Sequence, residues 1–167
     1  MFDLACEAIT ALKNGGLTVC TCESLTGGMI CSTLVDVPGA SRVVRGGLIT
    51  YQTDTKTLLA QVDAALITEH GVVSAEVAAA MAEGARKRLQ ADIAVSATGM
   101  ASPGEPENPP AGTVFVGVAS DEGTRVVPLR LHGTRAEIRQ MTVKAAIEAI
   151  IAEVQLRRAA ICSPCSE

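Results

Sequence analysis

Apolar residues along the chain alternate between helical spacing and the short continuous runs that are typical of buried strands. Helical spacing predicts helices over residues 2–14, 26–36, 53–61, 64–70, 75–90 and 134–158. Aliphatic runs predict strands over residues 17–23, 93–97, 112–119 and 125–131, with a further strand that ends near Tyr51. The last two strands flank Asp121, Glu122 and Gly123, which favours an antiparallel hairpin.

Strands that alternate with helices and finish in a hairpin predict an α/β fold, a three-layer α/β/α domain with a mixed, mostly parallel sheet. With 167 residues, 48% of them hydrophobic, the chain fits one domain over residues 1–158, followed by a flexible tail over residues 159–167. Residues 99–111 contain four of the seven prolines and are too irregular for a simple connector. We expect this long loop to serve a site.

Composition narrows the classes of partner. A net charge of −4 and only three aromatic residues argue against nucleic acid as a partner. No apolar run reaches the roughly 20 residues that a membrane span needs, and the N-terminus lacks the pattern of a secretory signal. We therefore expect a cytoplasmic protein without a membrane partner, with reduced cysteines. Cys162 and Cys165 lack a second pair of zinc ligands, so we expect no metal there.

Polar residues follow three of the predicted strands at their carboxyl ends, where open α/β sheets bind ligands. Glu23 and Ser24 end the first strand, Thr98 and Gly99 end the third, and Tyr51 and Lys56 follow the second. If the strands are parallel, Ser24, Tyr51, Lys56 and Thr98 meet at one edge. Each also has a structural interpretation by itself: a helix cap, a buried phenol, a solvated lysine or a turn hydroxyl.

This set of residues favours nucleophilic chemistry without histidine. His70 closes a short helix and His132 follows the last strand, so we expect no Ser/His/Asp triad. A serine is instead activated by a neutral lysine or a phenolate whose pKa the surroundings lower. The N–H groups around Gly27 and Gly28, or around Gly99, are the expected donors to an oxyanion.

Six blocks in fixed order carry a family resemblance: CESLTGG at 22–28, DVPGAS at 36–41, RGGLITY at 45–51, HGVVS at 70–74, ATGMASP at 97–103 and GTVFVGVA at 112–119. Together they resemble the C-terminal domain of the competence/damage-inducible protein CinA. The resemblance implies a nicotinamide-mononucleotide deamidase, which hydrolyses the amide to nicotinic acid mononucleotide and ammonia. It implies no cofactor, and a small-molecule nucleotide as the partner. Single-domain proteins of such families commonly associate, so a homo-oligomer is expected.

Matched block by block, the resemblance implies that Ser24 is the acyl-forming nucleophile and Lys56 the general base. Tyr51 would then relay or orient the proton, and Thr98 would contact the substrate. Arg135 and Arg139, four residues apart at the start of the last helix, form a candidate clamp for the substrate phosphate, although solvated surface arginines fit the same spacing. The other expected substrate-binding residues are Glu23, Thr26, Gly27, Gly28 and Gly99.

The chain also departs from the family pattern. Gln52 and Thr53 replace Ser-Asn, Ser102 replaces a glycine, and residues 104–111 replace a glycine-rich loop. These differences leave open a change of substrate or rate. Two alternative functions therefore stand beside the amidohydrolase. One is a non-catalytic module that binds a nucleotide phosphate, and the other is a degenerate member that only supports a partner protein.

Overall fold

The computed structural model describes residues 1–104 and 109–162. The helices are α1 (Phe2–Gly15), α2 (Met29–Val35), α3 (Thr53–Ala60), α4 (Ala64–His70), α5 (Ala75–Leu89) and α6 (Arg135–Cys162). The strands are β1 (Val19–Glu23), β2 (Val44–Ile49), β3 (Ile93–Gly99), β4 (Thr113–Ser120) and β5 (Gly123–Arg130). The expected turn before β2 is a short 3-10 helix, Ala40–Arg42.

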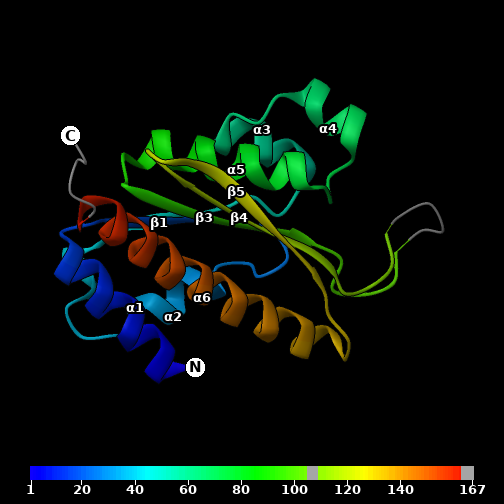
Figure 1. The fold of residues 1–167 in the computed structure, drawn as a ribbon. Coiled ribbons are helices and arrows are strands. Elements are labelled where there is room, and N and C mark those ends of the chain that lie inside the picture. The colour runs from blue at the N-terminus through cyan, green and yellow to red at the C-terminus, as the bar shows by residue number, and fades with distance from the viewer. Residues whose placement is uncertain (105–108, 163–167) are drawn as a thin grey trace.

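The five strands form one sheet in the order β2-β1-β3-β4-β5. Strand β1 runs parallel to both of its neighbours, β2 and β3. The β4–β5 hairpin is antiparallel and joins the sheet beside β3. The carboxyl ends of β1, β2 and β3 therefore lie at the same edge of the sheet, as the sequence predicts, and the loop that follows β3 extends from this edge (Figure 1).

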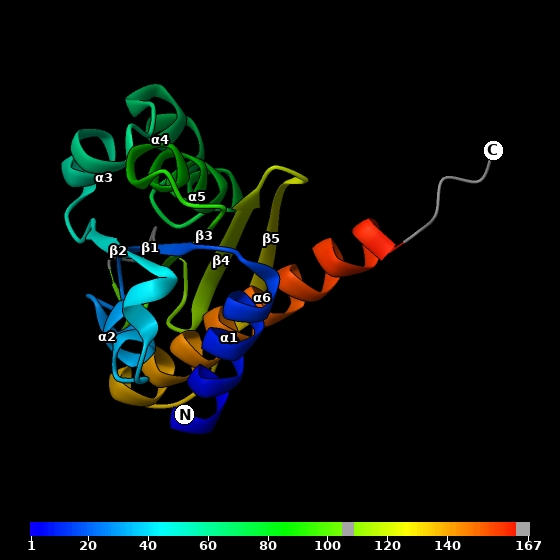
Figure 2. The ribbon, with the colours of Figure 1, turned by 90° about the vertical axis from the view of Figure 1, so that its left-hand side faces the viewer.

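Helices cover both faces of the sheet. Helices α3, α4 and α5 lie on one face, and α1, α2 and α6 lie on the other (Figures 1 and 2). Every residue of β1 is buried, because each face of this strand packs against one of two aliphatic clusters. The prediction of a three-layer α/β/α fold with a mixed sheet is confirmed.

The C-terminal helix differs from the prediction in its length. Helix α6 ends at Cys162 rather than near Arg158, so residues 159–162 of the expected tail are helical. The rest of that tail, including Cys165, lies outside the described residues. No helix in residues 1–104 and 109–162 combines the length and the apolar character that crossing a membrane requires.

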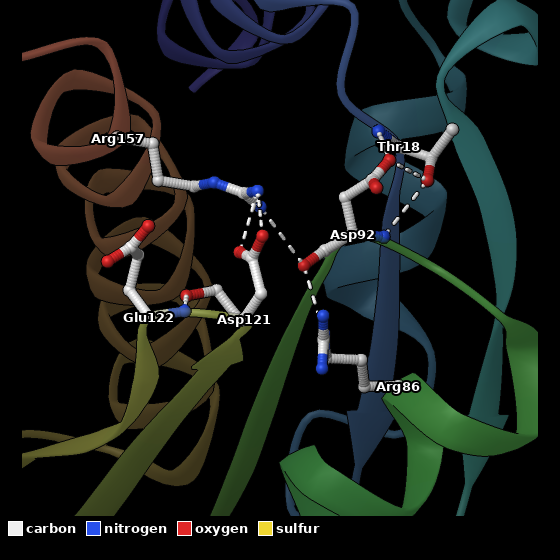
Figure 3. Close-up of polar contacts among 7 residues, drawn as sticks. Thr18, Arg86, Asp92, Asp121, Glu122 and Arg157 are labelled. Carbon is white, nitrogen blue, oxygen red and sulfur yellow. Dashed lines mark hydrogen bonds and ion pairs between the residues drawn. The ribbon is translucent and has the colours of Figure 1, made fainter. Parts of the chain in front are cut away.

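A polar network lies at one end of the sheet, before the first residues of β1 and β3 and opposite to their carboxyl ends (Figure 3). The Asp92 carboxylate accepts hydrogen bonds from the backbone N–H and the hydroxyl of Thr18, at 2.8 and 2.6 Å. The Asp92 carbonyl accepts from the guanidinium groups of Arg86 and Arg157. Arg157 also pairs with Asp121 in the β4–β5 turn. The network thereby connects α5, α6 and the starts of β1 and β3.

We expect Asp92→Asn to destabilise the protein at neutral pH by about 1–2 kcal/mol, because an amide oxygen is a weaker acceptor than the carboxylate for the two Thr18 donors and carries no charge to attract Arg86 and Arg157. Burial by itself raises the pKa of the Asp92 carboxyl, but the Thr18 hydrogen bonds and the nearby guanidinium groups outweigh it and lower that pKa. The carboxylate therefore stabilises the fold above the pKa of the unfolded state, and this contribution is lost as pH falls through the folded-state pKa. Urea unfolding should show a wild-type advantage at pH 7 that shrinks toward pH 3. An advantage of equal size at both pH values would contradict this origin.

Candidate active site

Ser24 stands immediately after β1, at the start of the turn that leads into α2. Its backbone N–H donates to the Ala97 carbonyl of β3 at 2.9 Å, which fixes the residue at the carboxyl edge of the sheet. The turn requires glycine at its end, because Gly27 and Gly28 have φ values of 61° and 97°. Ser24 remains 9% exposed and lines a pocket, together with Leu25 of the same turn.

Glu23 stabilises this turn through hydrogen bonds to its backbone. Its side chain is fully buried, and the carboxylate accepts hydrogen bonds from the N–H groups of Gly28, Ile30 and Cys31 at 2.8–3.0 Å. The Thr21 hydroxyl donates to the same carboxylate at 3.0 Å. The negative charge thus satisfies the otherwise unpaired donors at the start of α2. Glu23 does not line the pocket, and its contacts are with the backbone of the Ser24 turn; a role in substrate binding stays a prediction.

Arg139 holds the same turn from α6. Its guanidinium donates to the Leu25 carbonyl at 2.9 Å and to the Thr26 carbonyl at 3.0 Å. The residue is half-buried and does not line the pocket. The expected clamp of Arg135 and Arg139 on a phosphate is therefore not formed by this pair: only Arg135 reaches the pocket, and Arg139 is engaged with the backbone beside Ser24.

Lys56 approaches Ser24 from α3. Helix α3 packs closely on α5 at Gly84, where a β-carbon would overlap the carbonyl of Ala60. Lys56, on the same helix, has no exposed surface. Its Nζ lies 3.2 Å from the Ser24 Oγ and donates to the Thr50 carbonyl at 2.8 Å. The predicted meeting of the serine and the lysine is present in the structure.

The surroundings of Lys56 favour a neutral amine. Burial lowers the pKa of the Lys56 ammonium below its ordinary value, and the negative charge that Cys22 carries when ionised opposes this only in part. Among the described residues, no carboxylate forms an ion pair with Lys56. Burial in turn raises the pKa of the Cys22 thiol to about 11, so Cys22 is a protonated thiol at neutral pH. Ser24 is thus the group beside Lys56 that can deliver a nucleophile to the pocket.

The pocket has a volume of about 640 Å³, within the usual range for small-molecule sites. The expected site residues that line it are Ser24, Tyr51, Thr98, Gly99 and Arg135. The expected site residues that do not line it are Glu23, Thr26, Gly27, Gly28, Lys56 and Arg139. Among these, Lys56 is fully buried and contacts Ser24, which lines the pocket.

Thr98 and Gly99 form part of the pocket wall at the end of β3. The Thr98 hydroxyl donates to the Val72 carbonyl at 2.9 Å, which ties β3 to the segment between α4 and α5. A substrate contact of Thr98 stays a prediction. The N–H of Met100, next to Gly99, is engaged with the Thr113 carbonyl at 2.9 Å and offers no donor to an oxyanion.

The donors available to an oxyanion differ from those expected. The N–H groups of Gly27 and Gly28 are already engaged within the protein, at 3.1 and 2.9 Å from their acceptors. Within the part of the chain that the structure describes, the N–H groups of Leu25 and Thr26 donate to no protein acceptor. These two groups directly follow Ser24, and Leu25 lines the pocket. They are the better candidates for stabilising a negative oxygen near the nucleophile.

Sequence reasoning missed His70, which lines the pocket although it closes α4. The expectation that no histidine lies near the strand ends is therefore wrong. The His70 ring nitrogens lie 3.8 Å from a Glu69 oxygen and 3.9 Å from a Glu76 oxygen. No hydrogen bond joins His70 to Ser24 among the described residues, so a serine–histidine pair is not formed. The HGVVS block, which contains His70, was the available signal.

The described residues contain no cluster of three or more His, Cys, Asp or Glu side chains that could hold a metal ion.

The comparison with protein families gives a match to the CinA C-terminal domain over residues 2–154. A protein named as competence-damage inducible in Streptococcus gordonii is 43% identical over 142 residues, and one from Streptococcus pneumoniae is 39% identical over the same length. The match covers 84% of this chain and 34% of each relative, so the chain spans about a third of these relatives.

Solved structures of similar proteins agree with this assignment. The competence/damage inducible protein CihA from Agrobacterium tumefaciens is 38% identical with a TM-score of 0.87, covering 90% of this chain and 93% of that protein. A CinA superfamily protein from Klebsiella pneumoniae is 26% identical with a TM-score of 0.89, covering 92% of this chain and 97% of that protein. The family match and the relatives together show that the chain belongs to the CinA C-terminal domain family.

Proposed function

We propose that the protein is an amidohydrolase that converts nicotinamide mononucleotide to nicotinic acid mononucleotide and ammonia. One observation carries the chemistry: a fully buried lysine amine lies 3.2 Å from the hydroxyl of Ser24, which faces the pocket. The choice of substrate rests on the resemblance to the family. The pocket volume of about 640 Å³ accommodates a nucleotide of this size.

The first half of the reaction transfers the acyl group to Ser24. A neutral Lys56 keeps one N–H on the Thr50 carbonyl and turns its lone pair toward the Ser24 hydroxyl. As Ser24 Oγ attacks the carboxamide carbon, its proton moves to Lys56 and the carbonyl oxygen gains a negative charge. The N–H groups of Leu25 and Thr26 stabilise that charge. The C–N bond then breaks, and Lys56 returns the proton to the departing ammonia.

The second half regenerates the enzyme. Water attacks the nicotinoyl ester on Ser24, and Lys56 takes a proton from this water as it did from the serine. As the second tetrahedral intermediate collapses, the bond to Ser24 Oγ breaks, Lys56 returns its proton to Ser24 Oγ, and nicotinic acid mononucleotide is released. The buried amine therefore serves both halves of the cycle, and a separate histidine base is not needed.

The structure gives less support to the alternative of a non-catalytic phosphate-binding module. That alternative relied on the glycine turn and on the pair Arg135 and Arg139. The donors at the start of α2 are engaged by Glu23, and Arg139 is engaged by backbone carbonyls. Only Arg135 remains in the pocket from the expected phosphate-binding set.

Product analysis tests the proposal directly. Purified protein is incubated with nicotinamide mononucleotide, and the products are separated by chromatography while ammonia is assayed. We expect one nicotinic acid mononucleotide and one ammonia for each substrate consumed. Rapid acid quenching during turnover should leave a substrate-derived acyl group on the peptide that contains Ser24. Intact substrate, or an acyl group on a peptide without Ser24, would contradict the proposal.

A further inference from the structure

Three segments that are distant in sequence meet at the mouth of the pocket. Tyr51 follows β2, Ser102 belongs to the loop after β3, and Arg135 is the first residue of α6. The Arg135 guanidinium donates to the Ser102 hydroxyl at 2.8 Å and to the Tyr51 hydroxyl at 2.9 Å. All three residues line the pocket. We call this arrangement the Arg135 bridge.

The bridge leaves the positive charge of Arg135 available to an anionic ligand. Both of its partners are neutral hydroxyl groups, and no carboxylate pairs with Arg135 among the described residues. The neighbouring carboxylate of Glu137 is turned to the N–H and hydroxyl of Thr134, at 2.7 and 2.8 Å. Arg135 is also the single arginine or lysine among the described residues that line the pocket. A guanidinium has five N–H donors, so two hydrogen bonds to hydroxyls leave others free for a ligand.

The place of Tyr51 in the bridge bears on its function. Its side chain is 55% exposed, and its hydroxyl contacts Arg135 rather than Ser24 or Lys56. Lys56 reaches Ser24 directly, without an intervening phenol. The expected role of Tyr51 in relaying a proton therefore has no contact to support it in this structure.

We propose that Tyr51 and Ser102 are positioning residues that hold the Arg135 guanidinium to receive the phosphate monoester of a nucleotide substrate. Two hydrogen bonds from different segments fix the plane of the guanidinium, and a fixed plane binds two phosphate oxygens with less loss of side-chain entropy. Tyr51 thus acts in substrate recognition through Arg135. This inference rests on the proposed function for its substrate, and it adds the element that distinguishes a nucleotide from a nucleoside.

The test compares nicotinamide mononucleotide with nicotinamide riboside, which lacks the phosphate. For Tyr51→Phe and for Ser102→Gly, KM for the nucleotide should rise about threefold to tenfold, the loss expected for one hydrogen bond. The value of kcat, its pH profile and both constants for the riboside should not change. Arg135→Met should raise KM for the nucleotide further, and adding Tyr51→Phe to it should have no additional effect. Arg88→Met, an exposed arginine on α5, is the matched control.

Two kinetic results would contradict the proposed role of the Arg135 bridge in phosphate recognition. A fall of kcat in Tyr51→Phe with both substrates would place Tyr51 in proton transfer, and an equal rise of KM for both substrates would remove the link to phosphate. Thermal unfolding verifies that the variants fold, and Ser102→Ala replaces Ser102→Gly if the loop is affected. If the wild-type protein releases no ammonia, the proposed function fails by itself. Calorimetry of the nucleotide and the riboside then tests the bridge, and equal affinity for the two would end it.

Discussion

Replacing Lys56 by methionine is expected to lower turnover by orders of magnitude and to stabilise the protein at neutral pH. Removal of the general base lowers kcat by about 100-fold to 10,000-fold. Methionine has a similar length and fills the buried space of Lys56 without a charge. The loss of the hydrogen bond to the Thr50 carbonyl offsets part of the gain.

The pH dependence of that gain follows from the lowered pKa of Lys56. In the folded state the ammonium loses its proton at a lower pH than in the unfolded state, so the unfolded chain binds more protons between the two values. The fold therefore carries the full penalty below the folded-state pKa, and the penalty fades as pH rises from the folded-state pKa to the unfolded-state pKa. Each unit of difference corresponds to about 1.4 kcal/mol.

Urea unfolding of wild type and Lys56→Met at pH 6 and pH 10 measures this effect. The variant should be more stable at pH 6, and the two proteins should converge toward pH 10. In the wild type, kcat/KM should rise with pH over the same interval, because the neutral amine is the active form. Lys87→Met, an exposed lysine on α5, is the control. A variant that retains turnover, or whose stability difference is independent of pH, would contradict the assignment of Lys56 as a buried neutral base.

Replacing Glu23 by glutamine is expected to cost about 2–4 kcal/mol of stability and to lower kcat in the protein that remains folded. The carboxylate accepts four hydrogen bonds, three of them from the start of α2. An amide presents N–H toward one set of these donors, leaving buried groups unpaired and removing the charge that faces the helix N-terminus. The turn that carries Ser24 would shift as a result.

Chemical denaturation gives the loss of stability, and steady-state kinetics at a temperature where the variant is folded gives the loss of kcat. Glu83→Gln, an exposed glutamate on α5, should change neither quantity. If Glu23 binds substrate instead, the variant would keep its stability and show a raised KM. That outcome would restore the role expected from sequence and remove the positioning role.

The sequence was sufficient to locate the chemical pair but not to assign every side chain around it. Ser24 and Lys56 could be placed together because parallel strands bring their carboxyl ends to one edge, a rule that depends only on element order. The rule says nothing of side-chain direction. Glu23 and Arg139 lie in the expected segments, yet both turn toward backbone groups of the Ser24 turn, where unpaired helix donors and carbonyls attract them.

Residues contributed by connections were harder to predict. His70, at the end of α4, lines the pocket next to a segment that the Thr98 hydroxyl joins to β3 through the Val72 carbonyl. Ser102 meets Arg135 across more than thirty positions of sequence. Such contacts depend on loop paths, which hydrophobic periodicity does not describe. The hydrogen bond that Tyr51 makes with Arg135 rather than with Lys56 belongs to the same class.

The network around Asp92 and the turn around Ser24 occupy opposite edges of one sheet. Because of this separation, we expect tolerance to heat and the proposed turnover to be independently adjustable. Stabilising substitutions near Thr18, Asp121 or Arg157 are expected to leave the Ser24 turn unchanged, so a protein reinforced at that end of the sheet is a suitable starting point for varying the pocket.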